Sequence, residues 1–194
     1  MSFEFYLRIK RLFSRCVFKL LYARAFEFYG QKVSILGPDI IEGSKYISLY
    51  DNVSVGCKCW LLALKINDIN PILKIGPGTC IGRFSHIVSV KSVTIGKDVL
   101  IADKVYISDN VHDFSNVYMT IIKQPVIFKG EVIIGDGSWI GENVSIIGAK
   151  IGCQSIIGAN SVVTSDIPDY AIAVGSPARV IKLYNFSTNV WESI

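Results

Sequence analysis

Paired cysteines are missing from this chain, and histidine is scarce. The five cysteines are an odd number, and no two of them form a CxxC pair. A disulfide framework needs an even set, and structural zinc sites favour CxxC spacing, so we expect neither. We interpret the cysteines as small wall-forming residues of a protein in a reducing cytosol. No metal site is predicted.

Charge is also sparse. Asp, Glu, Lys and Arg make up 19% of the 194 residues, and the formal net charge is +4. This charge is too small, and too little clustered with aromatic residues, to indicate nucleic-acid binding. The hydrophobic share of 51% is high, which indicates a large aliphatic interior together with either buried subunit interfaces or contact with a membrane. The length allows one repeat core with short additions.

A long uninterrupted apolar run is absent as well. Residues 3–29 are apolar and aromatic, but a spanning helix needs about 20 mostly apolar residues and a signal peptide needs a clean apolar core. The interrupting basic residues are Arg8, Lys10, Arg11, Arg15, Lys19 and Arg24. We expect neither a spanning helix nor a secretory signal. Residues 1–30 are predicted to form amphipathic helix, which either packs on the core or on a neighbouring subunit, or contacts an anionic membrane surface.

What the chain does contain is an aliphatic residue at every sixth position, usually followed by Gly or Ala. The clearest positions are Ile75, Ile81 and Ile87; Ile95, Ile101 and Ile107; Ile134, Ile140 and Ile146; and Ile151, Ile157 and Val163. A period of six fits neither a helix nor an ordinary strand. It is typical of a solenoid of short parallel strands, with the aliphatic residues stacked inside. We predict this solenoid over residues 31–168 and a short extension over 169–194.

The period is interrupted in a few places. The longest interruption, residues 110–131, is predicted to project as a loop, and a shorter loop is expected over 64–71. A two-residue expansion lies within 88–94. Projecting loops on rigid scaffolds often carry function, so we expect 110–131 and 88–94 to shape the acceptor side of a site.

Several motifs resemble one known family. They are the His112 loop, IGDGSWIGENVSI at 134–146, IGANSVVTSDIP at 157–168 and AVGSPARVIK at 173–182. Together they are similar to hexapeptide-repeat acyltransferases of the galactoside, maltose and xenobiotic acetyltransferase group, and most of all to O-acetyltransferases of bacterial surface-polysaccharide (O-antigen or capsule) synthesis. The resemblance covers residues 45–194. It implies an all-β, left-handed parallel β-helix with an N-terminal helical segment, a homotrimer with sites between subunits, and acetyl-CoA as donor.

The resemblance assigns catalysis to His112. A hydroxyl that attacks a thioester must lose its proton near neutral pH, and imidazole suits that role as general base. The family reaction is direct, so no cysteine nucleophile is required. The oxyanion that forms would need a hydrogen-bond donor, commonly a backbone N–H. His86 either lines the acceptor cleft or belongs to the wall. Asn110 and Asp113 are acceptor-side candidates, and Asp109 or Asp113 is the candidate for orienting His112.

The resemblance also implies residues for the acetyl-CoA donor. Some family members carry lysine where this chain has Ser165, so two cationic residues further on are expected to meet the nucleotide phosphates. The candidate donor residues are Trp139, Gly141, Glu142, Ala159, Thr164, Ser165, Gly175, Arg179 and Lys182.

The leading hypothesis is O-acetylation of a sugar hydroxyl on a glycan, lipid-linked or nucleotide-linked acceptor, in the cytoplasm or on the cytoplasmic face of the inner membrane. Three alternatives stay open. One is N-acetylation of a nucleotide-linked amino sugar, because the same base would deprotonate an amine. Another is O-acetylation of an antibiotic or other xenobiotic. The third is a non-catalytic assembly protein; a carbonic-anhydrase-like branch of the fold needs three histidines, and this chain has two.

Overall fold

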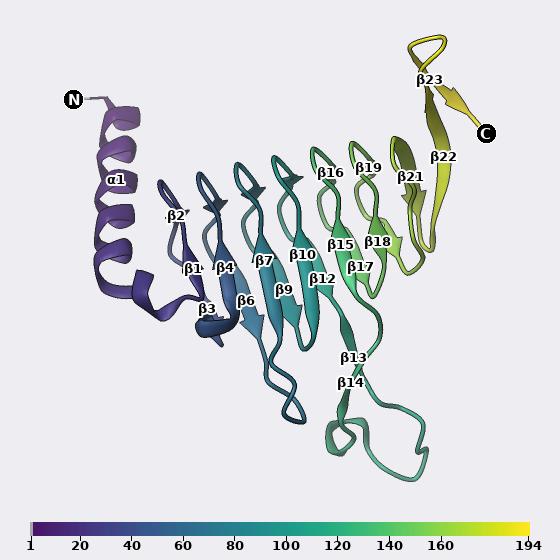
Figure 1. Cartoon of the computed structure of the whole chain (residues 1–194), viewed down its shortest axis with the longest axis horizontal. Helices are drawn as coiled ribbons and strands as arrows, with labels where there is room; N and C mark the ends of the chain where they lie inside the picture. Colours follow the sequence, from purple (N-terminus) through teal and green to yellow (C-terminus); the bar gives the residue numbers. More distant parts are fainter. Residues whose placement is uncertain (1) are drawn as a thin grey trace.

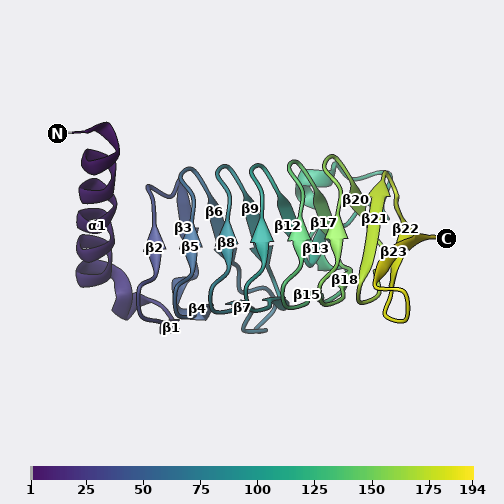
Figure 2. The same ribbon diagram turned by 90° about the horizontal axis from the view of Figure 1, so that it is seen from above.

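The computed structural model describes residues 2–194, which form a three-sided prism closed at one end by a helix and at the other by a hairpin (Figure 1). Helix α1 spans Phe3–Tyr22 and is followed by the short helix η1, Ala23–Ala25. Figure 2 shows that α1 also lies across the end of the prism when the molecule is turned by 90°. Within residues 2–194, no helix combines the length and the apolar character that crossing a bilayer requires.

Each turn of the prism contributes one strand to each of three faces, and successive turns pair in parallel. The first face contains β1 Phe28–Tyr29, β4 Ile47–Leu49, β7 Ile72–Ile75, β10 Ser92–Ile95, β15 Val132–Ile134 and β18 Lys150–Ile151. The second contains β2 Ser34–Ile35, β5 Ser54–Val55, β8 Cys80–Ile81, β11 Leu100–Ile101, β16 Trp139–Ile140, β19 Ile156–Ile157 and β21 Ala171–Gly175. The third contains β3 Ile40–Glu42, β6 Trp60–Ala63, β9 His86–Ser89, β12 Tyr106–Ser108, β17 Ser145–Ile147 and β20 Val162–Val163.

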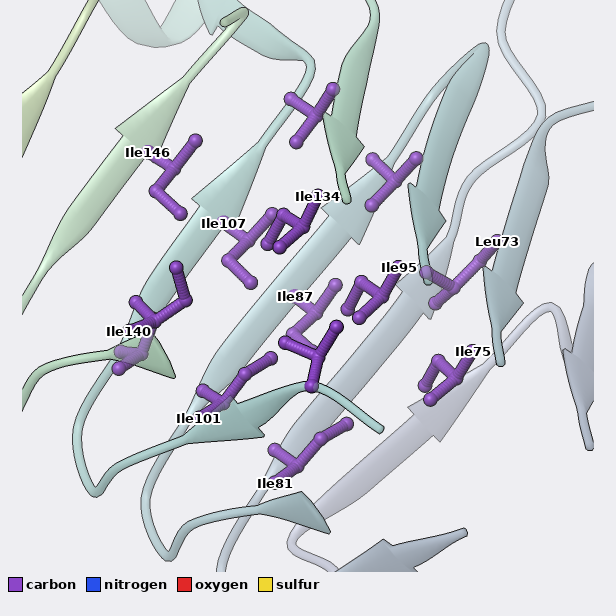
Figure 3. Close-up of a cluster of buried hydrophobic side chains, with 14 of the residues drawn as sticks. Leu73, Ile75, Ile81, Ile87, Ile95, Ile101, Ile107, Ile134, Ile140 and Ile146 are labelled. Atoms are coloured by element: carbon purple, nitrogen blue, oxygen red, sulfur yellow. The ribbon is translucent and has the colours of Figure 1, made fainter. Parts of the chain in front are cut away.

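The six-residue aliphatic positions form the core, as the period predicts. In register, they make one row per face: Ile75, Ile95 and Ile134 on the first, Ile81, Ile101 and Ile140 on the second, and Ile87, Ile107 and Ile146 on the third. All nine are at most 1% exposed, and Figure 3 shows them pointing into one continuous interior. Burial of each such side chain contributes about 1.5–3 kcal/mol to folding.

Both ends of the prism are covered. At the N-terminal end, Phe18 of α1 packs against Phe26 and Tyr29. The first strand therefore begins at Phe28, just before the expected boundary at residue 31. At the other end the wall continues past 168, because β21 pairs in parallel with β19. The antiparallel strands β22, Ala178–Asn185, and β23, Val190–Ser193, then extend the second face.

The departures from the six-residue period share one edge of the prism. We call it the loop edge: the corner at which the chain leaves the third face and enters the first. Its segments are η2 Ser44–Tyr46, the loop 64–71, the corner 90–91, the excursion 109–131, the corner 148–149 and the turn 164–166. The excursion projects as an antiparallel ribbon, β13 Asn110–His112 with β14 Val126–Phe128, and includes η3 Ile121–Lys123 (Figure 1).

The expected expansion over 88–94 is not a projecting loop, and this part of the prediction is wrong. The extra residues lengthen the strands β9 and β10, which leaves only Val90 and Lys91 between them. Val88 and Val90 are 7% and 4% exposed, so this corner is packed into the protein. The reason lies in a buried carboxylate from the next turn.

Candidate functional site

His112 lies at the root of the projecting ribbon. It is the last residue of β13 and pairs with Val126 of β14, so the two side chains share one face of the ribbon. The side chain is exposed. Among residues 2–194 no side chain forms a hydrogen bond or ion pair with its imidazole, which leaves both ring nitrogens open to a substrate or to another chain.

Asp109 does not orient His112; it braces the loop root. Its side chain is fully buried (0% exposed) and accepts hydrogen bonds from three successive backbone N–H groups across the corner 90–91. The donors are Val90 N at 2.9 Å, Lys91 N at 2.8 Å and Ser92 N at 2.8 Å, joined by Ser89 Oγ at 3.3 Å and Asn110 Nδ2 at 3.0 Å. The Asp109 carbonyl in turn accepts from Lys129 N at 2.8 Å, where the ribbon returns. One residue thus joins the two ends of the excursion.

Further polar contacts brace the loop. At its far end, Glu131 accepts from Ser92 Oγ at 3.0 Å and pairs with Lys150 Nζ at 3.3 Å; the hydrogen bond from Ser92 is the main cause of its lowered pKa. Within the loop, the buried side chain of Gln124 donates to the carbonyls of Asn116 and Met119 at 3.0 and 2.9 Å. The excursion therefore has a defined shape.

The predicted acceptor-side residues beside His112 have local partners. The side-chain amide of Asn110 donates a hydrogen bond to the Asp109 carboxylate, and its backbone N–H donates to Ser108 Oγ at 3.1 Å. Asp113 is partly buried and accepts a hydrogen bond from Ser115 N at 2.9 Å, and this backbone hydrogen bond is the main cause of its lowered pKa. Neither aspartate forms a hydrogen bond with His112 in this chain, so the residue that would orient the imidazole is not among these candidates within one subunit.

His86 lies on the outer surface of the third face, away from the projecting ribbon. Its ring packs between Trp60, with centroids 4.7 Å apart, and Tyr106, at 5.4 Å. Burial lowers the pKa of His86, and its Nε2 is enclosed without a hydrogen-bond partner. A cavity beside it is lined by Asp39, Lys58, Trp60, Phe84, Ser85 and His86. This packing favours a wall role for the imidazole, although its surroundings are open to a ligand.

Part of the predicted donor site gathers on a second edge, where the chain passes from the second face to the third. We call it the small-residue edge, and it is formed by Gly56, Gly82, Ala102, Gly141 and Gly158. A methyl group on Gly141 would lie 2.6 Å from Ala159 N, so the stacked corners exclude side chains there. Glu142 and Ala159 line one cavity on this edge, where Glu142 pairs with Lys104 Nζ at 3.0 Å.

Trp139 and Lys182 belong to one outward row on the second face. The register runs from Leu100 to Trp139, Ile156 and Ile172, and then to Lys182 of β22. Gly175, at φ 103°, ends β21 and donates its N–H to Ser161 Oγ at 3.0 Å. Arg179 pairs with Val174 across the hairpin. These predicted donor residues are therefore neighbours of the small-residue edge.

Thr164 and Ser165 lie elsewhere. They follow β20 and occupy the loop edge, the same edge from which the His112 ribbon departs. The third face separates them from Ala159, although the two sites are close in sequence. The predicted site residues thus form two groups on two edges of one prism, and a single chain does not bring them together.

Some neighbours of these residues were not predicted. Lys104, Asn143 and Asn160 line the cavity that contains Glu142 and Ala159. Each lies three residues after an inward isoleucine, in three successive turns. Alignment of the six-residue repeats would therefore have placed these side chains together. Trp60 and Tyr106 flank His86 through lateral register, which becomes visible only when the turns are aligned.

Comparison with solved structures identifies the fold. AntD, an N-acyltransferase from Bacillus cereus solved with dTDP and 3-hydroxybutyryl-CoA, matches with a TM-score of 0.73 and 22% identity, over 88% of this chain and 89% of that one. The hexapeptide-repeat acetyltransferase VCA0836 from Vibrio cholerae, solved with acetyl-CoA, matches with a TM-score of 0.62 and 24% identity, over 88% and 78% of the two chains. The protein has the left-handed β-helix fold of hexapeptide repeats, which confirms the predicted fold class.

Sequence comparison adds more specific relatives. The chain is 40% identical over 120 residues to "Putative lipopolysaccharide biosynthesis O-acetyl transferase WbbJ" of Escherichia coli K12, an alignment that covers 58% of this chain and 61% of WbbJ. It is 45% identical over 73 residues to "Probable acetyltransferase Rv3034c" of Mycobacterium tuberculosis, covering 37% and 23%. The match thus spans less than two thirds of either curated relative. No family model matches. The resemblance to hexapeptide-repeat acyltransferases is confirmed in both sequence and fold.

The brace formed by Asp109 can be tested by Asp109→Asn. An amide has a single acceptor oxygen and turns an NH₂ group toward backbone donors, so we expect a loss of about 1–3 kcal/mol in the free energy of unfolding. Urea denaturation measures this loss, and hydrogen exchange of the β13 and β14 amides reports whether the ribbon loosens. The matched control, Asp113→Asn, changes a carboxylate near the surface with one local backbone partner and should change stability by less than about 0.5 kcal/mol. Equal effects of the two variants would contradict the brace.

Proposed function

We propose that this protein is an acetyl-CoA-dependent O-acetyltransferase that acts on a sugar hydroxyl during synthesis of a bacterial surface polysaccharide. The observation that carries the proposal is the 40% identity to WbbJ together with an exposed histidine at the expected loop root. His86 is packed in the wall, so His112 is the histidine available for proton transfer.

In the proposed reaction, the acceptor hydroxyl attacks the thioester carbonyl while His112 takes its proton. The tetrahedral oxyanion is stabilised by a backbone N–H, and its collapse breaks the C–S bond. The departing thiolate receives the proton from the imidazolium, which yields free CoA and an acetyl ester. No acyl-enzyme forms, so none of the five cysteines is needed.

The small-residue edge suits the donor. Gly141 stacks closely on the backbone of Ala159, and Glu142 and Ala159 line a cavity beside it, so a slender pantetheine arm would run along this edge without meeting large apolar side chains. This chain has Ser165 where some family members have a lysine for the CoA phosphates. Arg179 and Lys182, in the C-terminal hairpin, would supply the positive charge instead. The chemistry of these residues fits acetyl-CoA.

We also propose a homotrimer. The loop edge carries His112, Thr164 and Ser165, whereas the small-residue edge carries Gly141 and Ala159. A neighbouring copy would bring one edge against the other, and three copies around an axis would complete three equal sites. Exposed apolar residues support such contacts: Leu100 and Trp139 are 50% and 49% exposed on the second face, and Tyr118 is 97% exposed on the loop.

N-acylation of an amino sugar is the second candidate, favoured by the fold match to AntD, whose structure contains dTDP. We infer that either reaction takes place in the cytoplasm near the inner membrane, where acetyl-CoA meets lipid-linked and nucleotide-linked sugars.

The two candidates can be separated by product chemistry. Purified protein with [acetyl-¹⁴C]-CoA should label O-antigen oligosaccharides and lipid-linked glycans in preference to nucleotide-linked amino sugars. An acetyl ester is removed by mild alkaline hydroxylamine, whereas an amide resists it. Label that is retained on an amino sugar after hydroxylamine would overturn O-acetylation in favour of the second candidate.

The role of His112 can be tested with His112→Ala. Loss of the general base should lower kcat/KM for acetyl transfer by about 10²–10⁴-fold, measured as CoA release. Glu27→Gln, an exposed position close to α1, serves as the control and should retain wild-type turnover. Unchanged turnover in a folded His112→Ala protein would exclude this mechanism.

Assembly of the site from two chains can be tested by complementation. His112→Ala removes the base from the loop edge, and Ala159→Trp fills the small-residue edge, so each variant alone should be inactive. In co-expressed mixed trimers, about one quarter of the sites would combine an intact His112 with an intact Ala159 from a neighbour. Recovery of about that fraction of wild-type activity is expected. If the site lay within one chain, the mixture would stay inactive.

A further inference from the structure

Helix α1 has one face directed at the prism and an apolar face directed away from it. Leu7, Ser14 and the cations Lys10 and Arg11 line a cleft toward Leu36 and Gly37 of the prism, and Phe18 packs on Phe26 and Tyr29. At 3.6 residues per turn, the opposite side of the helix carries a continuous stripe. This stripe consists of Phe5, Ile9, Leu12, Phe13, Cys16 and Leu20.

The stripe is unusually exposed for its composition. Phe13 and Leu20 are 71% and 85% exposed, and Phe5, Ile9 and Leu12 are each about half exposed (51%, 48% and 50%). Six apolar side chains on one exposed helical face form a patch of the kind that marks an interaction site. Packing on the first turn of the prism therefore accounts for one side of α1 and leaves the other side unexplained.

Basic residues flank the stripe on both sides. On the helical wheel, Arg8, Arg15 and Lys19 follow one margin, and Lys10 lies on the other. Glu4 is the single acidic residue within α1. In the part of the chain that the structure describes, no carboxylate forms an ion pair with any of these four cations.

This arrangement identifies the occupant. We propose that the apolar stripe of α1 inserts into the interfacial region of an anionic lipid bilayer, with the flanking cations on the lipid headgroups. An apolar helical face bordered by Lys and Arg is the chemistry of an in-plane membrane helix. Pairing of the stripe with a second copy would instead bring equal cationic margins side by side, because symmetric contacts repeat the same surface.

The position of α1 sets the orientation of the bound protein. In both Figure 1 and Figure 2 the helix runs across the end of the prism. A bilayer in contact with the stripe therefore meets the N-terminal end, and the long axis of the prism points away from the lipid. The turns then stack outward from the membrane, and the His112 ribbon projects sideways between the two ends.

Vesicle flotation tests the inference with the full-length protein. We expect flotation with vesicles of phosphatidylcholine and phosphatidylglycerol, about tenfold weaker binding to phosphatidylcholine alone, and release at high salt. The triple variant Ile9→Ser, Phe13→Ser, Leu20→Ser should lose binding by at least about tenfold. The matched control, Val117→Ser, Tyr118→Ser, Ile122→Ser, removes three apolar side chains from the projecting loop that are at least as exposed (83%, 97% and 88%), on average, as those of the stripe, and it should float like the wild type.

Two native cysteines provide a second readout. Cys16 lies within the stripe and Cys80 is exposed on the second face. A polarity-sensitive fluorophore on Cys16, in a protein whose other cysteines are serine, should shift to the blue with anionic vesicles, and the same label on Cys80 should not. Wild-type protein that stays with the pellet, or a stripe variant that floats normally, would overturn the inference. A stripe variant that changes the oligomeric state would assign the stripe to a subunit contact.

The inference is independent of the acyl-transfer proposal. The stripe variant should retain wild-type acetyl transfer to a water-soluble oligosaccharide in the absence of vesicles, because α1 is outside the proposed site. Loss of flotation with retained transfer supports the membrane surface, whereas absence of transfer in every variant would count against the enzyme proposal alone.

Discussion

The vertical stacking of aliphatic side chains controls this structure. The three inward residues of each turn must lie directly above those of the turn before. Otherwise gaps would form between the buried side chains. Ile95, for example, has Ile75 on one side and Ile134 on the other. This requirement sets the spacing of the inward residues, so additional residues either lengthen the strands beside a corner, as in β9 and β10, or leave the wall at that corner. In this chain both kinds of addition lie at one edge, the loop edge, and the corners of the other two edges are short.

A buried carboxyl group, that of Asp109, then ties both ends of the longest excursion to the prism. Among residues 2–194 no Lys or Arg pairs with Asp109; backbone N–H groups of the preceding turn donate hydrogen bonds to its carboxylate, and its carbonyl accepts a hydrogen bond from the returning strand. Hydrogen bonds to an ionised acceptor in a buried setting are the strong ones. His112 therefore lies on a ribbon whose two ends are attached to the prism, which is the arrangement that its proposed role as general base requires.

The six-residue period predicts the core, because an inward residue at every sixth place is a local property of the sequence. It also predicts that residues 110–131 leave the wall. It does not predict the packed corner at Val90, because the partner of that corner is Asp109 in the following turn and the contact depends on lateral register. The period also does not tell which edge of the prism each candidate site residue occupies. Ala159 and Thr164 are five residues apart in sequence, yet a hexad spans one face of the prism, so they occupy different edges and belong to different groups of the candidate site.

The uniform rise of the turns has a consequence for reach. Neighbouring strands lie about 4.8 Å apart, so the distance of a strand from α1 increases by this amount with each turn of the prism. From β1 to β15 the chain climbs four strand spacings along the first face. Insertion or deletion of one whole turn between α1 and β10 would change the distance between the His112 ribbon and α1 by one strand spacing. The structures of the ribbon and of α1 would stay the same. The distance of the His112 ribbon from α1 can therefore change in steps of one turn, without changes to either end of the prism.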